Sequence, residues 1–377
     1  MPEGLFDIRP LPLILLSIFL LVLIIQLIYY LIIFRRLGWY HHPSATEKQT
    51  GVSVVICAHN EYYNLKENLP LILEQNYPEF EVVVVNHASD DDTAFLLSEL
   101  EKRYPYLKTI EIRHDLNFFT GKKFPLSIGI KSARYNIILL TDADCKPASR
   151  EWISQFQSSF TGNTEIVLGY GPYNRSKGIL NRLIRFDTVH IAIQYLSYTL
   201  AGMPYMGVGR NLSYYKDLFY RNNGFISHYR IRSGDDDLFI NRVARKNNTS
   251  IMVEPGSYTY SDPKRSFEKW FTQKKRHLST SDHYRLKHKI LLGTYSASLW
   301  MFYLLFVLLL SLNYSIIPVL GIFFVRLLAQ YIIFNRCLHR LGEKDLLPFV
   351  WLYETLLLLL NSGIMISNIF HKSTRWK

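Results

Sequence analysis

Two groups of aspartates stand where a protein could use them for chemistry. In the first, Asp142 and Asp144 are separated by one alanine and follow an apolar run, so in an extended segment their carboxylates lie on the same side. Carboxylate oxygens are the ligands that Mg²⁺ and Mn²⁺ prefer, and these ions keep positions open for substrate phosphates. The sequence therefore predicts a site for Mg²⁺ or Mn²⁺ at Asp142 and Asp144.

The second group is the run Asp235, Asp236 and Asp237, which stands between Gly234 and an apolar stretch. Acids at the start of a helix stabilise its first turn by about 0.3 to 1 kcal/mol each, and this is the structural explanation of the run. The chemical alternative is that one carboxylate takes the proton of an acceptor hydroxyl, because crowded acids raise one another's pKa towards the working range. We favour the chemical alternative, in which one of these carboxylates is the base.

Gln273 and Arg276 are spaced i and i+3 in the helical stretch 268–278, so they share one helix face. An arginine in this position could stabilise a departing diphosphate as a bidentate donor. The structural alternative is a basic helix at a membrane surface, whose long side chains extend towards the headgroups.

The elements that must position these residues are typical of an α/β sheet. Residues 52–57 and 81–85 are β-branched runs of the kind found in buried parallel strands, and residues 65–75 between them have helical spacing. The same alternation predicts the following elements: helix 93–103, strand 108–113, helix 123–132 and strand 136–140. This order predicts a doubly wound fold.

Polar residues gather where three of these strands end. The first strand leads into residues 58–61, the second into 86–92 and the fourth into 141–144. Ligands of such sheets bind at the carboxyl ends of the strands, so we expect the three clusters to converge on one crevice. Residues 89–93 fit a helix N-cap equally well.

Apolar segments divide the chain into a membrane part and a polar part. Residues 11–34 are long enough to cross a hydrocarbon core of roughly 30 Å, and they are too long for a signal peptide. We expect the following organisation: a short N-terminal segment at 1–10, a transmembrane helix at 11–34, one domain at 48–285 and three transmembrane segments within 290–370.

The net charge of +12 is concentrated next to the apolar segments. Under the positive-inside rule, the basic residues at both ends of the polar region place the domain in the cytoplasm of a multi-pass protein of the cell (inner) membrane. They fit anionic membrane lipids better than a nucleic-acid groove, so no nucleic-acid partner is expected. The basic tail 371–377 would lie outside if the last segment crosses, so that segment is re-entrant or the tail is an exception. The three cysteines fit reduced cytoplasmic thiols.

Residues 52–284 resemble the membrane-bound family 2 glycosyltransferases, the superfamily of cellulose synthase-like and hyaluronan synthase-like enzymes. The similar motifs are SVVICAHNE, Gly121-Lys122-Lys123, Asp142-Ala143-Asp144, GVGRNLSY, GDDDLF and QKKRH. The resemblance implies a GT-A domain, which is a Rossmann-like α/β fold that binds nucleotide-diphospho-sugars, together with transmembrane helices.

The resemblance also implies a role for each matching residue. Those expected at the nucleotide-sugar donor are Ala58, His59, Asn60, Glu61, Asn86, His87, Lys122 and Asp142. Asp144 is implied as the main ligand of Mg²⁺ or Mn²⁺, Asp235 or Asp236 as the base, and Gln273 with Arg276 as the catalytic block. Asn86-His87 replaces the usual pair of aspartates, and a UDP-sugar is the donor that the resemblance favours.

The implied reaction is an inverting, metal-dependent transfer to a hydroxyl of a glycan or lipid acceptor, as in the synthesis of cell-envelope glycans or glycolipids. One alternative is a processive polysaccharide synthase, which His277 disfavours because chain-polymerising members have tryptophan there. Arg326 and Glu354, inside the apolar segments, could line a path for a polymer, although we favour their pairing with each other. The other alternative is an inactive nucleotide-sugar sensor or scaffold, which the presence of all the acids disfavours.

Overall fold

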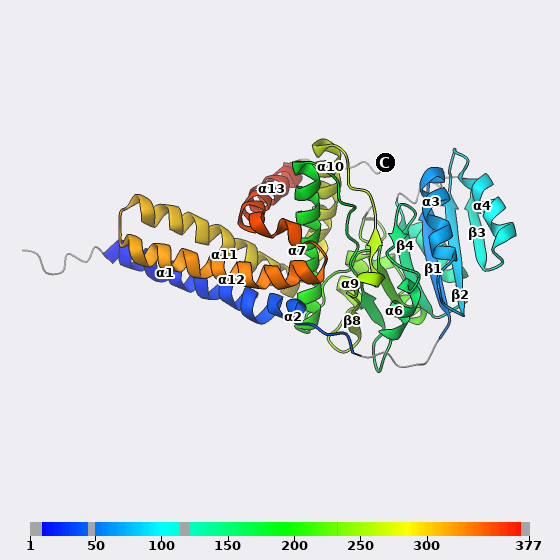
Figure 1. The fold of residues 1–377 in the computed structure, drawn as a ribbon, viewed down its shortest axis with the longest axis horizontal. Helices are drawn as coiled ribbons and strands as arrows, with labels where there is room; N and C mark the ends of the chain where they lie inside the picture. Colours follow the sequence, from blue (N-terminus) through cyan, green and yellow to red (C-terminus); the bar gives the residue numbers. More distant parts are fainter. Residues whose placement is uncertain (1–9, 44–49, 114–120, 232, 371–377) are drawn as a thin grey trace, which may run out of the picture.

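The computed structural model describes residues 10–43, 50–113, 121–231 and 233–370. The predicted N-terminal segment, except Pro10, and the basic tail 371–377 lie outside this range. A bundle of long helices forms one end of an elongated molecule and an α/β domain forms the other (Figure 1).

One seven-stranded sheet forms the centre of the domain. Its order is β3-β2-β1-β4-β7-β6-β8, and its strands are β1 (Val52–Ala58), β2 (Phe80–His87), β3 (Leu107–Ile112), β4 (Ile137–Asp142), β6 (Ile166–Leu168), β7 (Leu212–Tyr215) and β8 (Thr249–Ile251). The first four are mutually parallel, whereas β7 is antiparallel to both β4 and β6. The predicted α/β class is confirmed, and the parallel part is the half that the sequence predicts. A separate small sheet pairs β5 (Lys146–Pro147) with β9 (Thr259–Tyr260).

Alternate residues of the parallel strands bury opposite faces of the sheet. In β1, Val54 and Ile56 belong to one apolar cluster and Val55 to another. The first cluster is covered by α3 (Tyr62–Leu73), α4 (Thr93–Arg103) and α6 (Trp152–Ser158). The second is covered by α5 (Lys123–Ser132), α7 (Ile179–Leu200), α8 (Lys216–Arg221) and α9 (Asp237–Val243). Both faces are therefore closed, as a doubly wound sheet requires.

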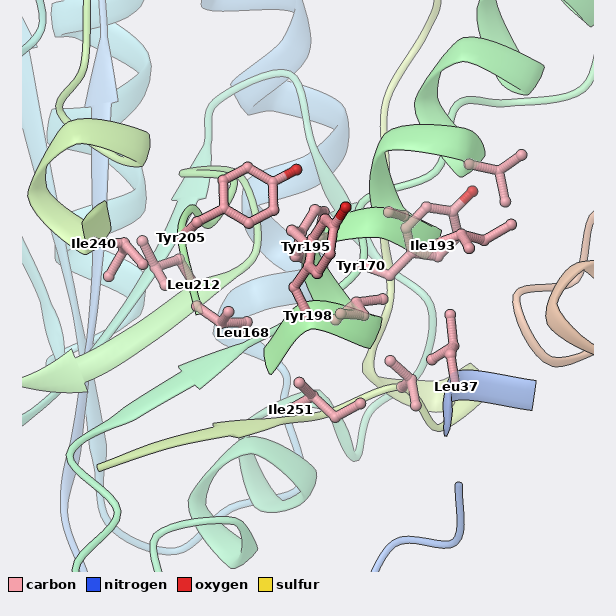
Figure 2. Packing of buried hydrophobic residues seen from close by; sticks show 14 of the residues in the cluster. Leu37, Leu168, Tyr170, Ile193, Tyr195, Tyr198, Tyr205, Leu212, Ile240 and Ile251 are labelled. Atoms are coloured by element: carbon pink, nitrogen blue, oxygen red, sulfur yellow. The ribbon is translucent and has the colours of Figure 1, made fainter. Parts of the chain in front are cut away.

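Helix α7 joins the sheet to the helical bundle, and the sequence reading did not predict it. It is buried over most of its length. Figure 2 shows Tyr195 and Tyr198 of α7 between Leu168 and Leu212 on the sheet side and Leu37 on the bundle side. The Tyr195 hydroxyl also donates to the Gly169 carbonyl at 2.6 Å. The domain and the bundle consequently share one continuous apolar core.

In the described part of the chain, four helices are long and apolar enough to cross a membrane, which indicates membrane association. The bundle contains α1 (Pro10–Ile28), which continues through a π-helical turn (Tyr29–Phe34) into α2 (Arg35–Gly38), together with α11 (Leu286–Ser311) and α12 (Ile316–Arg340). The fourth helix is α13 (Val350–Phe370), which follows a short helix at Lys344–Phe349. It does not run beside the other three but crosses the domain end of the bundle, next to α7 and α10 (Phe267–Leu278) (Figure 1).

A buried ion pair fixes α13 to the bundle. Arg326 of α12 donates to Glu354 of α13 at 2.5 Å, and neither side chain is exposed to solvent. The hydroxyls of Tyr30 and Tyr295 donate to the same carboxylate at 3.0 and 2.8 Å. The favoured interpretation of the two intramembrane charges, that they pair with each other, is confirmed.

Candidate active site

A cavity of about 1630 Å³ opens at the carboxyl edge of the sheet and brings most of the predicted site residues together. Those that line it are Ala58, His59, Glu61, His87, Lys122, Asp142, Asp144, Asp235, Asp236, Gln273 and Arg276. They come from three strand ends, from the segments directly before α5 and α9, and from α10. The predicted convergence on one crevice is confirmed.

The acidic pair has the geometry of a divalent-cation site. Asp142 ends β4, and Asp144 lies in the turn that follows. One carboxylate oxygen of each aspartate and the sulfur of Cys145 all lie within 4.8 Å of one another. Burial raises the pKa of the Cys145 thiol well above its ordinary value, and the thiol donates to Asp144 at 3.5 Å. The two carboxylates remain as hard ligands, and this donor set fits Mg²⁺ or Mn²⁺.

The charges around the pair are unequally distributed. Desolvation opposes the ionisation of Asp142, but the Lys122 ammonium, which donates to this carboxylate, lowers its pKa. Desolvation in the cavity, and then the charge of Asp142, raise the pKa of Asp144. A cation held between the two carboxylates would relieve their mutual repulsion.

Each of the three adjacent aspartates has a different environment. Asp236 precedes α9, and its two oxygens accept from the backbone N–H groups of Asp237 at 2.7 Å and Gly209 at 2.8 Å. Asp237 is buried and accepts from the hydroxyls of Thr280 and, at 2.8 Å, Tyr284. Among the described residues, no side chain or backbone group donates to the Asp235 carboxylate, which lines the cavity. Of the three aspartates, only Asp235 therefore has both carboxylate oxygens available to accept a hydrogen bond from a substrate.

The backbone before the aspartates is held in an unusual shape. Gly234 has φ of +95°, and a Cβ at this position would lie 2.4 Å from Leu238, so glycine is required. The buried Lys123 ammonium donates to the carbonyls of His228 at 2.8 Å, Ser233 at 2.6 Å and Ile231. A lysine on α5 thus fixes the segment that presents Asp235, a role that spacing alone does not indicate.

Helix α10 presents Gln273 and Arg276 to the cavity. Gln273 donates to the Tyr173 hydroxyl at 3.4 Å, while the Nε of Arg276 is buried and has no hydrogen-bond partner among the described residues. Between them, Lys274, which also lines the cavity, forms a buried ion pair with Asp187 of α7 at 2.5 Å. Both predicted residues of α10 line the cavity, and the lysine between them anchors this helix to α7.

Arg210 is a cavity residue that the sequence reading did not single out. It lies over the Tyr173 ring, 4.4 Å from its centroid, and donates to the Ser261 hydroxyl at 3.2 Å. Its charge lowers the pKa of Asp142 as a minor contribution after Lys122. The signal that could have identified it is its place within GVGRNLSY.

Asn60 and Asn86, predicted to bind the nucleotide-sugar, do not line the cavity but form hydrogen bonds within loops. Asn60 accepts from the Asp90 N–H at 2.8 Å, and its own N–H donates to Ser89 at 2.9 Å. Ser89 in turn donates to Asn86 at 2.6 Å. These bonds tie the end of β1 to the end of β2, which places His59 and His87 at the cavity wall with ring centroids 6.3 Å apart.

Comparison with known proteins identifies the family. Residues 53–219 match the family described as "Glycosyl transferase family 2", and residues 137–360, more than half of the chain, match "Glycosyl transferase family group 2". A poly-beta-1,6-N-acetyl-D-glucosamine synthase of Staphylococcus epidermidis is 32% identical over 101 residues, covering 27% of this chain and 23% of the relative. A probable glycosyltransferase of Bacillus subtilis, YdaM, is 28% identical over 142 residues, covering 37% of this chain and 34% of the relative. The matches thus span about a quarter to a third of these curated relatives.

A solved structure has the same overall fold. The mannosyltransferase PcManGT from Pyrobaculum calidifontis, in complex with GDP-Man and Mn²⁺, superposes with a TM-score of 0.58 at 18% identity, covering 90% of this chain and 98% of that one. Its likeness supports the GT-A fold. From the family match and the fold together, the chain belongs to the family 2 glycosyltransferases, enzymes that transfer a sugar from a nucleotide-sugar donor.

Proposed function

We propose that the protein transfers the sugar in a single inverting displacement that depends on Mg²⁺ or Mn²⁺ held by Asp142 and Asp144. This proposal is supported by the residues that share one cavity. They are the acidic pair, the cations Lys122, Arg210 and Arg276, and Asp235, which accepts no hydrogen bond from the described residues. A divalent cation bound at the pair would supply positive charge to the diphosphate of the leaving nucleotide.

In this proposal Asp235 is the general base. Its carboxylate faces the cavity without a donor among the described residues, so it can accept a proton from an acceptor hydroxyl as the oxygen attacks the anomeric carbon. Asp236 is less suited, because both its oxygens accept backbone N–H groups. A single displacement of this kind inverts the anomeric carbon and needs no covalent nucleophile.

The remaining polar residues are assigned to the leaving nucleotide. Arg276, whose buried Nε has no partner among the described residues, is suited to donate to a diphosphate oxygen, and Gln273 lies on the same face. His59, His87, Ala58 and Glu61 form the wall at the ends of β1 and β2, where the nucleoside would lie. A uridine nucleotide remains the proposed donor.

We place the reaction at the cytoplasmic face of the cell membrane. The domain is joined to helices long enough to span a bilayer, and basic side chains follow α1 and precede α11. Under the positive-inside rule both flanks favour the cytoplasm.

The test is nucleotide release by the detergent-purified protein from a panel of nucleotide-sugars with Mn²⁺. Asp144→Ala is the test variant and Asp217→Ala, an exposed aspartate on α8 outside the cavity, is the control. We expect release from one donor, abolished by EDTA and reduced at least a hundredfold in Asp144→Ala only. Release that is unaffected by EDTA would refute metal dependence, and donor binding without turnover would favour a sensor.

A further inference from the structure

The cavity extends beyond the acids to α7, α10, α11 and α13, which all contribute lining residues, and we call this part the acceptor arm. This acceptor arm is lined by carbon-rich side chains: Ile191, Leu292, Leu299, Leu357, Leu358 and Met365. The same helices also contribute polar lining residues, among them Asp187, His190, Gln194, Ser296, Glu354 and Asn361. His190 contacts Gln194 at 3.4 Å, and the Oδ1 of Asn361 is buried and accepts no hydrogen bond from the described residues. The arm therefore presents apolar surface beside polar groups, whereas the part that contains the aspartates is polar.

The position of the arm indicates what fills it. Two of its walls, α11 and α13, are helices apolar enough to enter a bilayer, and their outward faces expose further apolar residues such as Trp300 and Leu359. Met365 lies at the edge, since it lines the cavity and is 56% exposed. Apolar side chains between such helices stabilise a hydrocarbon chain by burying it.

In the described part of the bundle, apolar side chains fill the space between the helices that a polymer path would need. Its axis is filled by Phe19, Phe302, Leu305, Leu309 and Val319, none of them more than 3% exposed. Closer to the domain, the Arg326–Glu354 pair with its tyrosine partners fills the same axis. A growing polysaccharide that left through the bundle would have to displace these groups.

We infer that the acceptor is a membrane lipid with a hydroxyl-bearing head group, whose apolar chain lies in the acceptor arm between α11 and α13 and whose hydroxyl reaches Asp235. This inference rests on the proposed function, because it takes Asp235 as the base. The hydroxyl oxygen forms the new bond to the anomeric carbon, its proton goes to Asp235, and the nucleotide diphosphate leaves with the electrons of the broken bond.

The first experiment measures where the transferred sugar goes. The protein is reconstituted in vesicles of total polar lipid from the expressing cells and given the labelled donor that the wild type hydrolyses. Met365→Trp fills the edge of the arm, and Ile366→Trp, at a position that is 58% exposed and does not line it, is the matched control. A deeper pair is Leu358→Trp, at a lining position that is 8% exposed, and Leu359→Trp, at an outward-facing position that is 51% exposed.

We expect label in the chloroform–methanol extract, at least tenfold less with Met365→Trp and Leu358→Trp than with their controls. Each of the four variants should unfold cooperatively in a thermal melt without vesicles, which shows that it is folded. Label found only in a water-soluble or ethanol-insoluble glycan, or equal transfer by test and control variants, would overturn the inference.

The second experiment needs no turnover and so separates this inference from the proposed function. A benzophenone side chain is introduced at position 358 or 359 and illuminated in the same vesicles. We expect position 358 to form a lipid adduct of one head-group class, and position 359 to react with bulk lipid. Cross-links from position 358 only to the protein itself would refute the acceptor arm even if nucleotide release is normal.

Discussion

At the scale of single residues, adjacent aspartates of the same chemical type differ in function because their partners differ. Asp237 is held by two hydroxyls and Asp236 by two backbone N–H groups, whereas Asp235 faces the cavity. A carboxylate oxygen that already accepts a backbone hydrogen bond is less accessible to an acceptor hydroxyl than one that faces the cavity with none. The run therefore combines a helix cap, a buried anchor and the proposed base.

We expect Asp235→Asn to lower kcat for sugar transfer by about a hundredfold to ten-thousandfold, because it removes a general base without changing size. The donor KM should change little, since the acidic pair is untouched. Steady-state kinetics with the donor identified above provides the check. Asp237→Asn is the contrasting variant, for which we expect a lower melting temperature; a greater loss of kcat in Asp236→Asn than in Asp235→Asn would reassign the base.

Asp236 should make stability depend on pH. Desolvation, and then the charges of Asp235 and Asp237, raise its pKa from 3.8 to about 7. The folded protein thus binds this proton more tightly than the unfolded chain, so the stabilisation is present at low pH and is lost as pH rises through about 7. We expect the melting temperature of the wild type, relative to Asp236→Asn, to fall between pH 5 and 7 and to level off above. A difference that rises with pH would contradict the assignment.

At the scale of elements, α10 is useful to the site because a buried ion pair fixes it to α7. Lys274 and Asp187 are 2.5 Å apart, and the lysine lies between Gln273 and Arg276 in the helix. Removing one partner of a buried pair leaves the other charge unpaired, which typically costs about 3 to 5 kcal/mol. The orientation of Gln273 and Arg276 depends on this contact.

We expect Lys274→Met to lower the melting temperature and to reduce transfer at least tenfold. The double variant Lys274→Met/Asp187→Leu should regain most of the lost stability, because neither charge is then buried alone. Thermal melting and transfer rates of both proteins, measured side by side, test this coupling. Equal melting temperatures for the single and double variants would show that the pair does not anchor α10.

The sequence pattern predicts the parallel half of the sheet well because its strands are continuous β-branched runs. Predicted strand 52–57 corresponds to Val52–Ala58, and predicted helices 93–103 and 123–132 match α4 and α5. Helix α7 does not show an amphipathic pattern, since it is buried both by the sheet and by the bundle. The short strands β6 and β8 have three residues each, too few for a periodic signal.

The candidate site could be predicted where residues follow strands or share a helix face. Asp142, Asp144, Asp235, Gln273 and Arg276 all line the cavity. Sequence spacing could not show that Asn60 and Asn86 bond within their loops, nor that Arg210 and Lys123 reach the site, because these contacts depend on how separate segments pack. The roles of all these residues remain predictions.

At the scale of the whole molecule, the contacts of α13 indicate on which side of the membrane the basic tail lies. The end of this helix bonds to the domain: Lys275 of α10 donates to Ser367 at 2.9 Å, and Asn368 donates to the Lys275 carbonyl at 3.2 Å. The beginning of α13 is held at the domain end of the bundle through Glu354. Both ends are thus near the domain, which favours the re-entrant alternative over a complete crossing.

We expect an epitope placed after residue 377 to be on the same side of the membrane as the domain. In inverted vesicles, added protease should remove this epitope together with the domain, whereas an epitope at Asn313, in the loop between α11 and α12, should be protected. Immunoblotting of both tagged proteins gives the result. Protection of the terminal epitope would show that α13 crosses completely.

The continuous core also determines when the protein can finish folding. Tyr30 donates to Glu354 across 324 residues of sequence, and the apolar cluster of the sheet includes both Tyr29 and Tyr353. At a synthesis rate of roughly 5 to 20 residues per second, on the order of 15 to 65 s separate the emergence of these partners from the ribosome. During this interval the bundle side of α7 has no α12 or α13 to cover it. A chain that terminates before α13 should therefore be cleared by cellular proteases and should not accumulate as a smaller transferase.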